Sequence, residues 1–318
     1  MKNLRIAILG FGTVGGGTYH ILTENHDIIE KRTGVSIDVV KVLNRRVKPG
    51  IPQDILTTDP DDILTCPDID LVVETIGGIE PATSFMLQAM KHGKHVVTAN
   101  KAAVAANYEI LQQTAAENNV QFLFEASVGG GIPVLTAIQN PLQGNHFTEV
   151  MGIVNGTTNY ILTKMTDEGA DYADVLKDAQ EKGFAEADPT ADVEGIDVAN
   201  KLSILIALLF DQYIAPTDIP TVGISKITLD DIKAAAEENC KLKLIAHATY
   251  ESGKVTASVA PEKIPYAHPL AGVSNEFNAV FINGDMVGEL MFYGKGAGAL
   301  PTGSAVVGDI ITIAKSLK

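Results

Sequence analysis

Short apolar runs alternate with helical and turn segments through residues 1–130. The runs are mostly rich in Val, Ile or Phe, and they predict strands over residues 4–9, 37–43, 70–74, 95–98 and 121–125. Between them, Pro81 begins a predicted helix that ends at His92–Gly93, and residues 102–118 supply the next helix. Strands that alternate with helices in this way form a parallel sheet covered by helices.

The pattern changes after Gly129–Gly131. A run at 146–154 is followed by several helices and by strands at 241–250 and 254–260, and Asn283–Gly284 predicts a tight hairpin between 278–282 and 285–293. These strands predict an antiparallel sheet suited to a dimer interface. We therefore expect an α/β protein: a Rossmann-like dinucleotide-binding domain (1–130), an α+β catalytic and dimerisation domain (131–300), and a C-terminal segment (301–318) whose helix, at 303–316, returns to the first domain.

The composition narrows the function classes. The 318 residues are 46% hydrophobic and carry a formal net charge of −15, which argues against nucleic acid or an anionic membrane as partner. The apolar helical stretch at 202–210 is too short to span a bilayer. Cys66 and Cys240 are isolated, and no leader precedes the first strand, so we expect a cytoplasmic enzyme that acts on a small molecule.

The first apolar run leads directly into a glycine turn at residues 10–15. Gly10 permits a tight turn, Gly12 lets the backbone approach a pyrophosphate, and Gly15 allows the next helix to pack closely. The helix N-terminus then offers N–H groups to the phosphates. An ordinary strand–turn–helix connection gives the same spacing. The expected cofactor-binding residues of the turn are Gly10, Phe11, Gly12, Thr13, Val14 and Gly15.

Two arginines follow the second predicted strand. Arg45 and Arg46 stand where an NAD-preferring site usually places Asp or Glu, and an arginine there suits the 2′-phosphate of NADP. The distance from Gly10 is longer than usual, so a solvated basic turn is the alternative. The sequence favours NADP, with NAD possible.

Polar segments occur at the ends of later strands. Thr98–Lys101 lies at the edge where an open parallel sheet binds its ligand, so Lys101 is expected to reach the cofactor or the substrate, with a surface lysine as the alternative. Glu125–Pro133 offers oxygen ligands for a hard cation, or a hinge between domains. In Asn155–Tyr160, Thr residues are suited to cap a helix and to present backbone donors.

The densest polar segment spans residues 183–201. Asp188–Pro189 predicts a helix cap and first helical residue. Asp197 and Lys201 are four residues apart and share a helix face, which usually means an exposed ion pair. The apolar helix that follows favours a buried pair instead, in which lysine exchanges protons with a carbonyl or hydroxyl.

Together these segments resemble homoserine dehydrogenases over essentially the whole chain, in the same order and with similar spacing. The resemblance implies reversible, NAD(P)-dependent interconversion of L-homoserine and L-aspartate 4-semialdehyde. Many members carry an additional C-terminal regulatory domain, whereas this chain ends at Lys318 after its final predicted helix. We therefore expect a short form without feedback control through such a domain, acting as a homodimer.

The resemblance also implies residue roles. Lys201 is the proton donor to the aldehyde oxygen, and Asp197 and Lys101 orient substrate and protons. The remaining expected residues are Glu186, Asp192, Asp197 and Thr157 for substrate; Arg45, Arg46, Lys101, Gly183 and Gly303 for cofactor, besides the glycine turn; and Glu125, Val128, Gly130 and Ile132 for a monovalent cation, Na⁺ or K⁺.

Two other functions compete with this one. Aspartate-semialdehyde dehydrogenase also has a nucleotide domain but needs a cysteine nucleophile, and neither Cys66 nor Cys240 has a recognisable catalytic setting. A non-catalytic nucleotide sensor would keep the Rossmann domain alone, and the presence of both Asp197 and Lys201 speaks against it.

Overall fold

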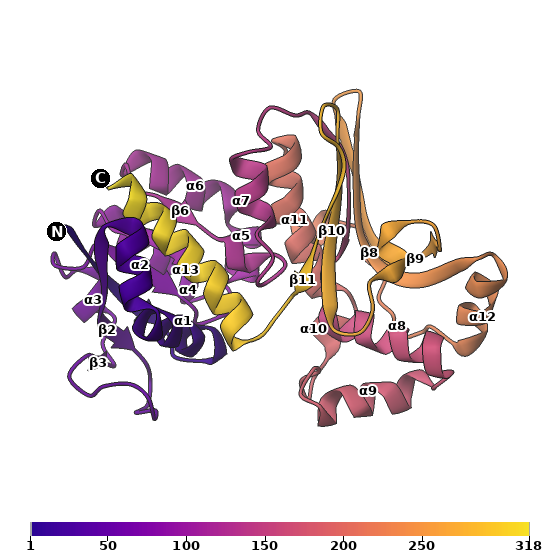
Figure 1. Cartoon of the computed structure of the whole chain (residues 1–318), viewed down its shortest axis with the longest axis horizontal. Coiled ribbons are helices and arrows are strands. Elements are labelled where there is room, and N and C mark those ends of the chain that lie inside the picture. The colour runs from indigo at the N-terminus through magenta and orange to yellow at the C-terminus, as the bar shows by residue number, and fades with distance from the viewer. Residues whose placement is uncertain (1, 318) are drawn as a thin grey trace. The chain divides into compact units, whose positions relative to one another are not determined.

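The structure is a computed structural model that describes residues 2–317. The chain divides into two compact units: unit 1 comprises Met1–Gly131 and Ala297–Lys318, and unit 2 comprises Ile132–Gly296. The colours of Figure 1 show that unit 1 combines the start of the chain with its end.

Unit 1 is built on a six-stranded parallel sheet with the order β3-β2-β1-β4-β5-β6. The chain order reverses beside β1, which is the Rossmann arrangement. Its strands are β1 (Lys2–Leu9), β2 (Val35–Leu43), β3 (Leu56–Thr57), β4 (Leu71–Glu74), β5 (His95–Thr98) and β6 (Phe122–Leu123). Its helices are α1 (Thr13–Glu24), α2 (His26–Thr33), α3 (Asp61–Leu64), α4 (Ala82–Lys91), α5 (Lys101–Ala106), α6 (Tyr108–Glu117), the 3-10 helix Glu125–Ser127 and α13 (Ala299–Ser316).

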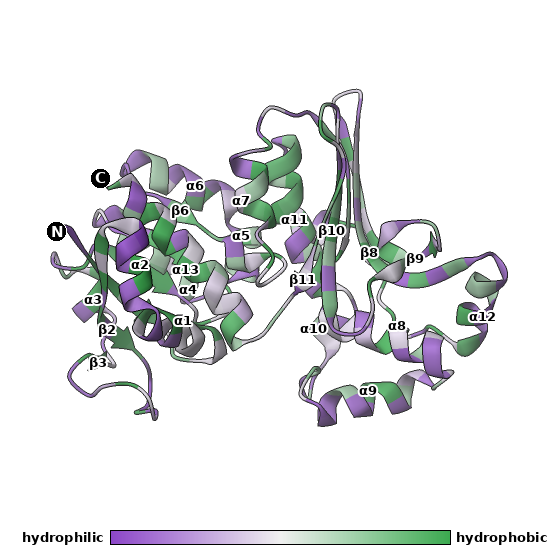
Figure 2. Ribbon diagram, in the orientation of Figure 1, coloured by the Kyte–Doolittle hydropathy of each residue, from purple (hydrophilic) through white to green (hydrophobic). Residues whose placement is uncertain are grey.

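The core of unit 1 joins the first strand to the last helix. Leu4, Ile6 and Ile8 of β1 are fully buried, as are Ile310 and Ile313 of α13, and all five belong to one hydrophobic cluster. The apolar run of β1 is therefore covered by residues from the opposite end of the chain. Figure 2 shows this as hydrophobic residues gathered on the elements of the sheet and on α13.

Two helix predictions in unit 1 were wrong in their bounds. Residues 102–118 form two helices, because the backbone of Asn107 departs from helical geometry (φ −132°) between α5 and α6. The Asn107 amide donates to Ala103 O and to Thr83 Oγ1 of α4, so a contact from another helix holds the break. The last helix begins at Ala299 rather than at residue 303, since Pro301 is tolerated within the first turn.

Unit 2 contains a five-stranded antiparallel sheet with the order β11-β10-β7-β8-β9. The predicted α/β fold, with a Rossmann-like parallel sheet and a mainly antiparallel second sheet, is confirmed. The strands are β7 (Phe147–Ile153), β8 (Cys240–Glu251), β9 (Lys254–Pro265), β10 (Phe277–Gly284) and β11 (Gly288–Lys295). The helices are α7 (Val134–Gln139), α8 (Gly156–Glu168), α9 (Tyr172–Glu181), α10 (Thr190–Val193), α11 (Ile196–Phe210), α12 (Leu229–Glu237) and the 3-10 helices Pro216–Asp218 and Pro269–Gly272.

The predicted hairpin turn at Asn283–Gly284 was wrong. Both residues are paired with β11, Asn283 with Glu289 and Gly284 with Gly288, so the turn comprises residues 285–287. Two contacts from outside the hairpin hold it: His146 N donates to Asp285 Oδ1, and Val287 N donates to Asn145 Oδ1. Within residues 2–317, no helix is both long enough and apolar enough to cross a membrane.

Candidate active site

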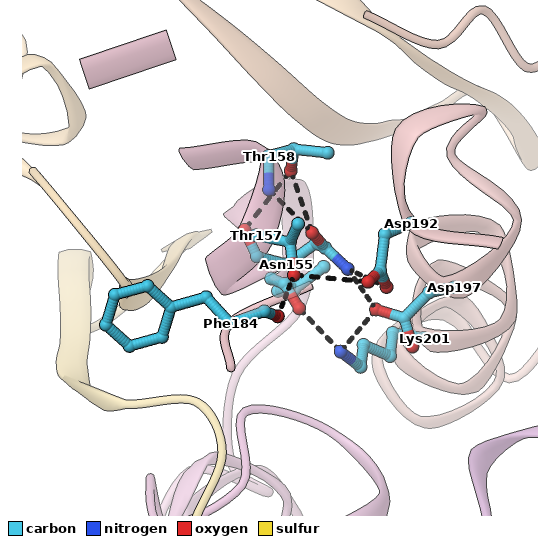
Figure 3. A network of polar contacts seen from close by, with 8 residues as sticks. Asn155, Thr157, Thr158, Phe184, Asp192, Asp197 and Lys201 are labelled. Atoms are coloured by element: carbon cyan, nitrogen blue, oxygen red, sulfur yellow. Dashed lines mark hydrogen bonds and ion pairs between the residues drawn. The ribbon is translucent and has the colours of Figure 1, made fainter. Parts of the chain in front are cut away.

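A buried polar network in unit 2 surrounds the first turns of α11 (Figure 3). Lys201 Nζ donates to Asp197 Oδ2 at 2.7 Å and to the backbone carbonyl of Val154 at 2.6 Å. Asp197 and Lys201 are both buried, although most helical pairs of this spacing lie on a surface. The pair is buried because α11 is apolar on most sides, from Val198 to Phe210.

Asn155 connects this pair to the start of α8. Its Nδ2 donates to Asp197 Oδ2 at 2.9 Å and to Asp192 Oδ1 at 2.7 Å, while its Oδ1 accepts from the backbone N–H of Thr158 at 2.9 Å. Asn155 is thus the N-cap of α8, a role that the sequence assigned to the Thr residues of this segment. Sequence analysis missed its side chain as a site residue, although Asn is a preferred N-cap residue.

Thr157 joins the loop before α10 to the same network. Its hydroxyl contacts the Phe184 carbonyl at 2.7 Å and Asp192 Oδ2 at 3.1 Å, as Figure 3 shows. Thr157, Asp192, Asp197 and Lys201, four of the predicted site residues, therefore share one network. Gly183 and Glu186 are exposed residues of the adjoining loop, and Gly183 has a φ of +75°.

The predicted cap of α10 was wrong by one residue. Pro189 is the N-cap itself rather than the first helical residue, and Asp188 Oδ1 accepts from the backbone and hydroxyl of Thr190. These hydrogen bonds, the side-chain one first, lower the pKa of Asp188.

The glycine turn of unit 1 has the geometry that a pyrophosphate needs. Gly10 has a φ of +91°, and a Cβ on Gly15 would lie 2.1 Å from the Gly10 carbonyl oxygen, so both positions require glycine. Gly12 is the N-cap of α1 and has no side-chain cap, and a Cβ there would enter open space. The backbone donors at the start of α1 are therefore accessible to an anion.

A cavity of about 580 Å³ lies beside this turn within unit 1. Asn44 and Lys48 join the loop after β2 to the turn: Phe11 N donates to Asn44 Oδ1 at 3.3 Å, and Lys48 Nζ donates to Phe11 O at 3.0 Å. The cavity thus combines a helix N-terminus with basic side chains, which fits a phosphate-bearing dinucleotide. The lining includes Gly10, Phe11, Gly12, Asn44, Arg45, Arg46, Lys48, Thr75, Ile76 and Gly77.

Sequence analysis missed a buried carboxylate just before Thr75, Ile76 and Gly77, which line the cavity. Glu74, which ends β4, is fully buried; its Oε1 accepts from Ile76 N at 2.7 Å and its Oε2 from Thr98 Oγ1 at 2.6 Å. Burial raises the pKa of the Glu74 carboxyl, and these hydrogen bonds oppose the rise. A charged residue that ends an otherwise apolar strand was the available signal. Thr98 in turn accepts from Asn100 N, just before Lys101 begins α5.

The segment around Glu125 is buried in unit 1. Glu125 and Val128 are enclosed, and Gly130 has a φ of +57°. Asp309 of α13 accepts from the backbone N–H of Glu125 at 2.9 Å, and burial raises the pKa of Asp309 to about 8. Among residues 2–317, no three His, Cys, Asp or Glu side chains group to hold a metal ion, so a cation here would depend on carbonyl ligands. Ile132, the fourth expected ligand, is the first residue of unit 2.

Gly303 lies at a close helix crossing in unit 1. A Cβ on Gly303 would come within 2.8 Å of the Gly17 backbone in α1, and one on Gly17 within 2.0 Å of the Ala299 carbonyl oxygen. This packing explains glycine at both positions, and a contact of Gly303 with the cofactor stays a prediction.

Comparison with known proteins gives matches over nearly all of this chain. Residues 133–311 match the family described as homoserine dehydrogenase, and residues 10–125 match the homoserine dehydrogenase NAD binding domain. The homoserine dehydrogenase of Bacillus subtilis is 44% identical over 100% of this chain and 74% of its own length.

Solved structures agree with these matches. A homoserine dehydrogenase from Thiobacillus denitrificans superposes with a TM-score of 0.95 at 43% identity, over 99% of this chain and 74% of that one. A hyperthermophilic archaeal homoserine dehydrogenase in complex with NADPH has a TM-score of 0.82 at 28% identity, over 98% of this chain and 97% of that one. The matches support neither a thioester-forming semialdehyde dehydrogenase nor a nucleotide sensor. The chain belongs to the homoserine dehydrogenase family of oxidoreductases.

Proposed function

We propose that the chain interconverts L-homoserine and L-aspartate 4-semialdehyde in the aspartate-derived route to threonine, methionine and isoleucine. The observation that carries the assignment of residues is the buried Lys201–Asp197 pair, because a lysine held by two acceptors presents its proton in a fixed direction. Lys201 donates that proton to the aldehyde oxygen during reduction and receives it during oxidation. Asp197 orients the Lys201 ammonium. Lys101, the first residue of α5, assists in orienting substrate and protons.

The carboxylates of unit 2 supply substrate recognition. The ammonium of homoserine matches a carboxylate, and Asp192, Asp197 and Glu186 provide three. Thr157 adds a hydroxyl that is already directed by the Phe184 carbonyl and Asp192. This set supports binding of a small amino acid with one polar group at each end.

Unit 1 binds the dinucleotide, which supplies or accepts the hydride when bound. The glycine turn (residues 10–15) holds the pyrophosphate at the N-terminus of α1, and Arg45 and Arg46 give a preference for NADP through its 2′-phosphate. The relative solved with NADPH supports this choice. Gly183, Gly303 and Lys101 complete the proposed cofactor contacts.

A monovalent cation, Na⁺ or K⁺, is proposed at the Glu125 carboxyl group and the carbonyls of Val128, Gly130 and Ile132. One carboxylate with carbonyl oxygens is a donor set that suits a hard cation of low charge. Gly129 (φ +72°) and Gly130 (φ +57°) give this segment a left-handed backbone that glycine adopts readily.

A homodimer in the cytoplasm is the proposed assembly, without nucleic acid or membrane as partner. Large apolar side chains are exposed on and beside β11: Met286 (79%), Met291 (40%) and Tyr293 (52%). Exposed apolar residues grouped on one hairpin are typical of a surface that another subunit covers.

The experiment that tests this proposal measures absorbance at the reduced-nicotinamide band while the purified protein oxidises L-homoserine. NADP⁺ and NAD⁺ are supplied in parallel reactions. Homoserine-dependent reduction, faster with NADP⁺, is expected. Absence of reduction with both cofactors, despite demonstrated dinucleotide binding, would contradict the proposed substrate.

A further inference from the structure

We propose that Asn155 is a positioning residue for the reaction: its amide holds the carboxylates of Asp192 and Asp197 in the arrangement that orients the Lys201 ammonium. The inference rests on the proposed roles of Lys201 and Asp197. Asn155 follows Val154, whose carbonyl accepts from Lys201 Nζ, and the sequence analysis did not select its side chain.

The start of α8 sets the orientation of the Asn155 amide. Oδ1 accepts from Thr158 N at 2.9 Å and from Thr158 Oγ1 at 3.0 Å. A backbone N–H can only donate, so the amide oxygen must face the helix. The NH₂ group is therefore turned toward the carboxylates, and each lies within hydrogen-bond distance, Asp192 at 2.7 Å and Asp197 at 2.9 Å.

The same carboxylate oxygen serves both the amide and the lysine. Asp197 Oδ2 accepts from Asn155 Nδ2 and from Lys201 Nζ, and the carbonyl of Val154, the preceding residue, accepts from Nζ as well. Val154 thus reaches the ion pair through its backbone carbonyl. Asn155 reaches it through its side chain, as Figure 3 shows. A shift of the Asp197 carboxylate therefore also displaces Lys201 Nζ, which donates to it.

Loss of the two amide donors has a predictable result. Asp192 and Asp197 would then lose the amide donor that they share, and repulsion between their like charges would turn their side chains apart. Displacement of a reacting group by about 1 Å costs about 100-fold in rate. Substrate turnover should therefore fall while dinucleotide binding in unit 1 stays the same.

Two substitutions separate this role from the capping of α8. Asn155→Ser keeps an oxygen that accepts from Thr158 N but has no amide, and Ser is a good N-cap residue. Asn155→Asp also keeps the cap and replaces the NH₂ with an acceptor. Asn140→Asp, an exposed residue at the end of α7, is the matched control for the Asn-to-Asp change.

The expected result is a fall of kcat for homoserine by about 100-fold in both variants, with unchanged affinity for NADPH, measured by its fluorescence. In Asn155→Asp the new carboxyl faces Asp192, Asp197 and Lys201, and the two neighbouring carboxylates favour its protonation at low pH. A protonated carboxyl donates again, so the ratio of variant to wild-type kcat should rise from about pH 9 to about pH 5.5 in this variant alone.

Several outcomes overturn the inference: wild-type turnover in Asn155→Ser, a ratio that does not change with pH in Asn155→Asp, or loss of folding in both variants, which would assign Asn155 to helix stability only. Lys201→Ala distinguishes failure of the proposed function from failure of the role of Asn155. If that variant keeps its turnover, the proposed function fails. If it loses turnover while the Asn155 variants keep theirs, only the role of Asn155 fails.

Discussion

The ion pair between Lys201 and Asp197 is shielded from solvent, with side chains 10% and 5% exposed. Other pairs of the same spacing in this chain are open to water: the side chains of Lys177 and Glu181 are 77% and 69% exposed. The same i, i+4 pattern therefore has two different consequences. Exposed pairs contribute about 0.3–0.5 kcal/mol, whereas removal of one partner from a buried pair costs about 3–5 kcal/mol.

Replacement of Lys201 by Ala should reduce turnover by about 10²- to 10⁴-fold, because the positioned proton donor is lost. Affinity for the dinucleotide should remain nearly unchanged. The rate must be expressed per folded molecule, since Asp197 is left buried without its partner. Lys177→Ala is the matched control and should behave as wild type. Normal turnover of Lys201→Ala would exclude it as the proton donor.

Alanine at Gly12 and alanine at Gly15 should affect different properties, dinucleotide binding and stability. A Cβ at position 12 meets no protein atom within 4 Å, so Gly12→Ala should fold normally but weaken dinucleotide binding where the Cβ enters the ligand's space. A Cβ at position 15 would lie 2.1 Å from Gly10 O, so Gly15→Ala should lose about 1–3 kcal/mol of stability or more. Urea unfolding and KM for NADP⁺ measure the two effects. Equal loss of stability in both variants would contradict this division.

Arg45 and Arg46 should determine the choice of cofactor. A double change to Ser removes charge-assisted hydrogen bonds to a 2′-phosphate, worth about 1.5–3 kcal/mol each, so kcat/KM for NADP⁺ should fall by about 10²- to 10⁴-fold. The value for NAD⁺ should change little, since NAD⁺ lacks that phosphate. The exposed Arg32 of α2 provides the control for a loss of positive charge. Parallel losses with both cofactors would mean that the arginines form only a solvated basic turn.

His247 should make stability depend on pH. It lies between Glu262, 3.2 Å from Nδ1, and Glu149, 3.1 Å from Nε2, and chiefly the hydrogen bond with Glu262 raises its pKa. A raised pKa means that the contribution is fully present below about pH 6.5, the value for unfolded His, and is lost as pH rises through the folded value.

The free energy of unfolding of wild type should therefore fall more between about pH 6 and pH 9 than that of His247→Gln. The difference should be at most about 1 kcal/mol, because the three side chains are partly exposed. Chemical denaturation at several pH values measures it, with the exposed His20→Gln as control. Identical pH profiles of wild type and His247→Gln would disprove this role.

Local patterns in the chain predicted much of the fold. The apolar runs near β1, β2, β4 and β5 and the glycine turn after β1 were found where the structure has them, because each depends on residues close together in sequence. The two-residue strand β3 was not predicted, since Leu56–Thr57 is too short to show a period. The break at Asn107 and the turn at 285–287 were missed because contacts from α4 and from Asn145–His146 hold them.

The sequence by itself determined that Asp197 and Lys201 share a helix face and that the helix is apolar, since both follow from the 3.6-residue period. Only the tertiary structure decided what this pair meets. Asn155 lies 42 positions from Asp197 and 37 from Asp192, and the Val154 carbonyl lies 47 from Lys201. Such contacts depend on how α8 and α11 pack at the end of β7. No local pattern encodes that packing, because burial in the core, rather than residue spacing, brings these groups together.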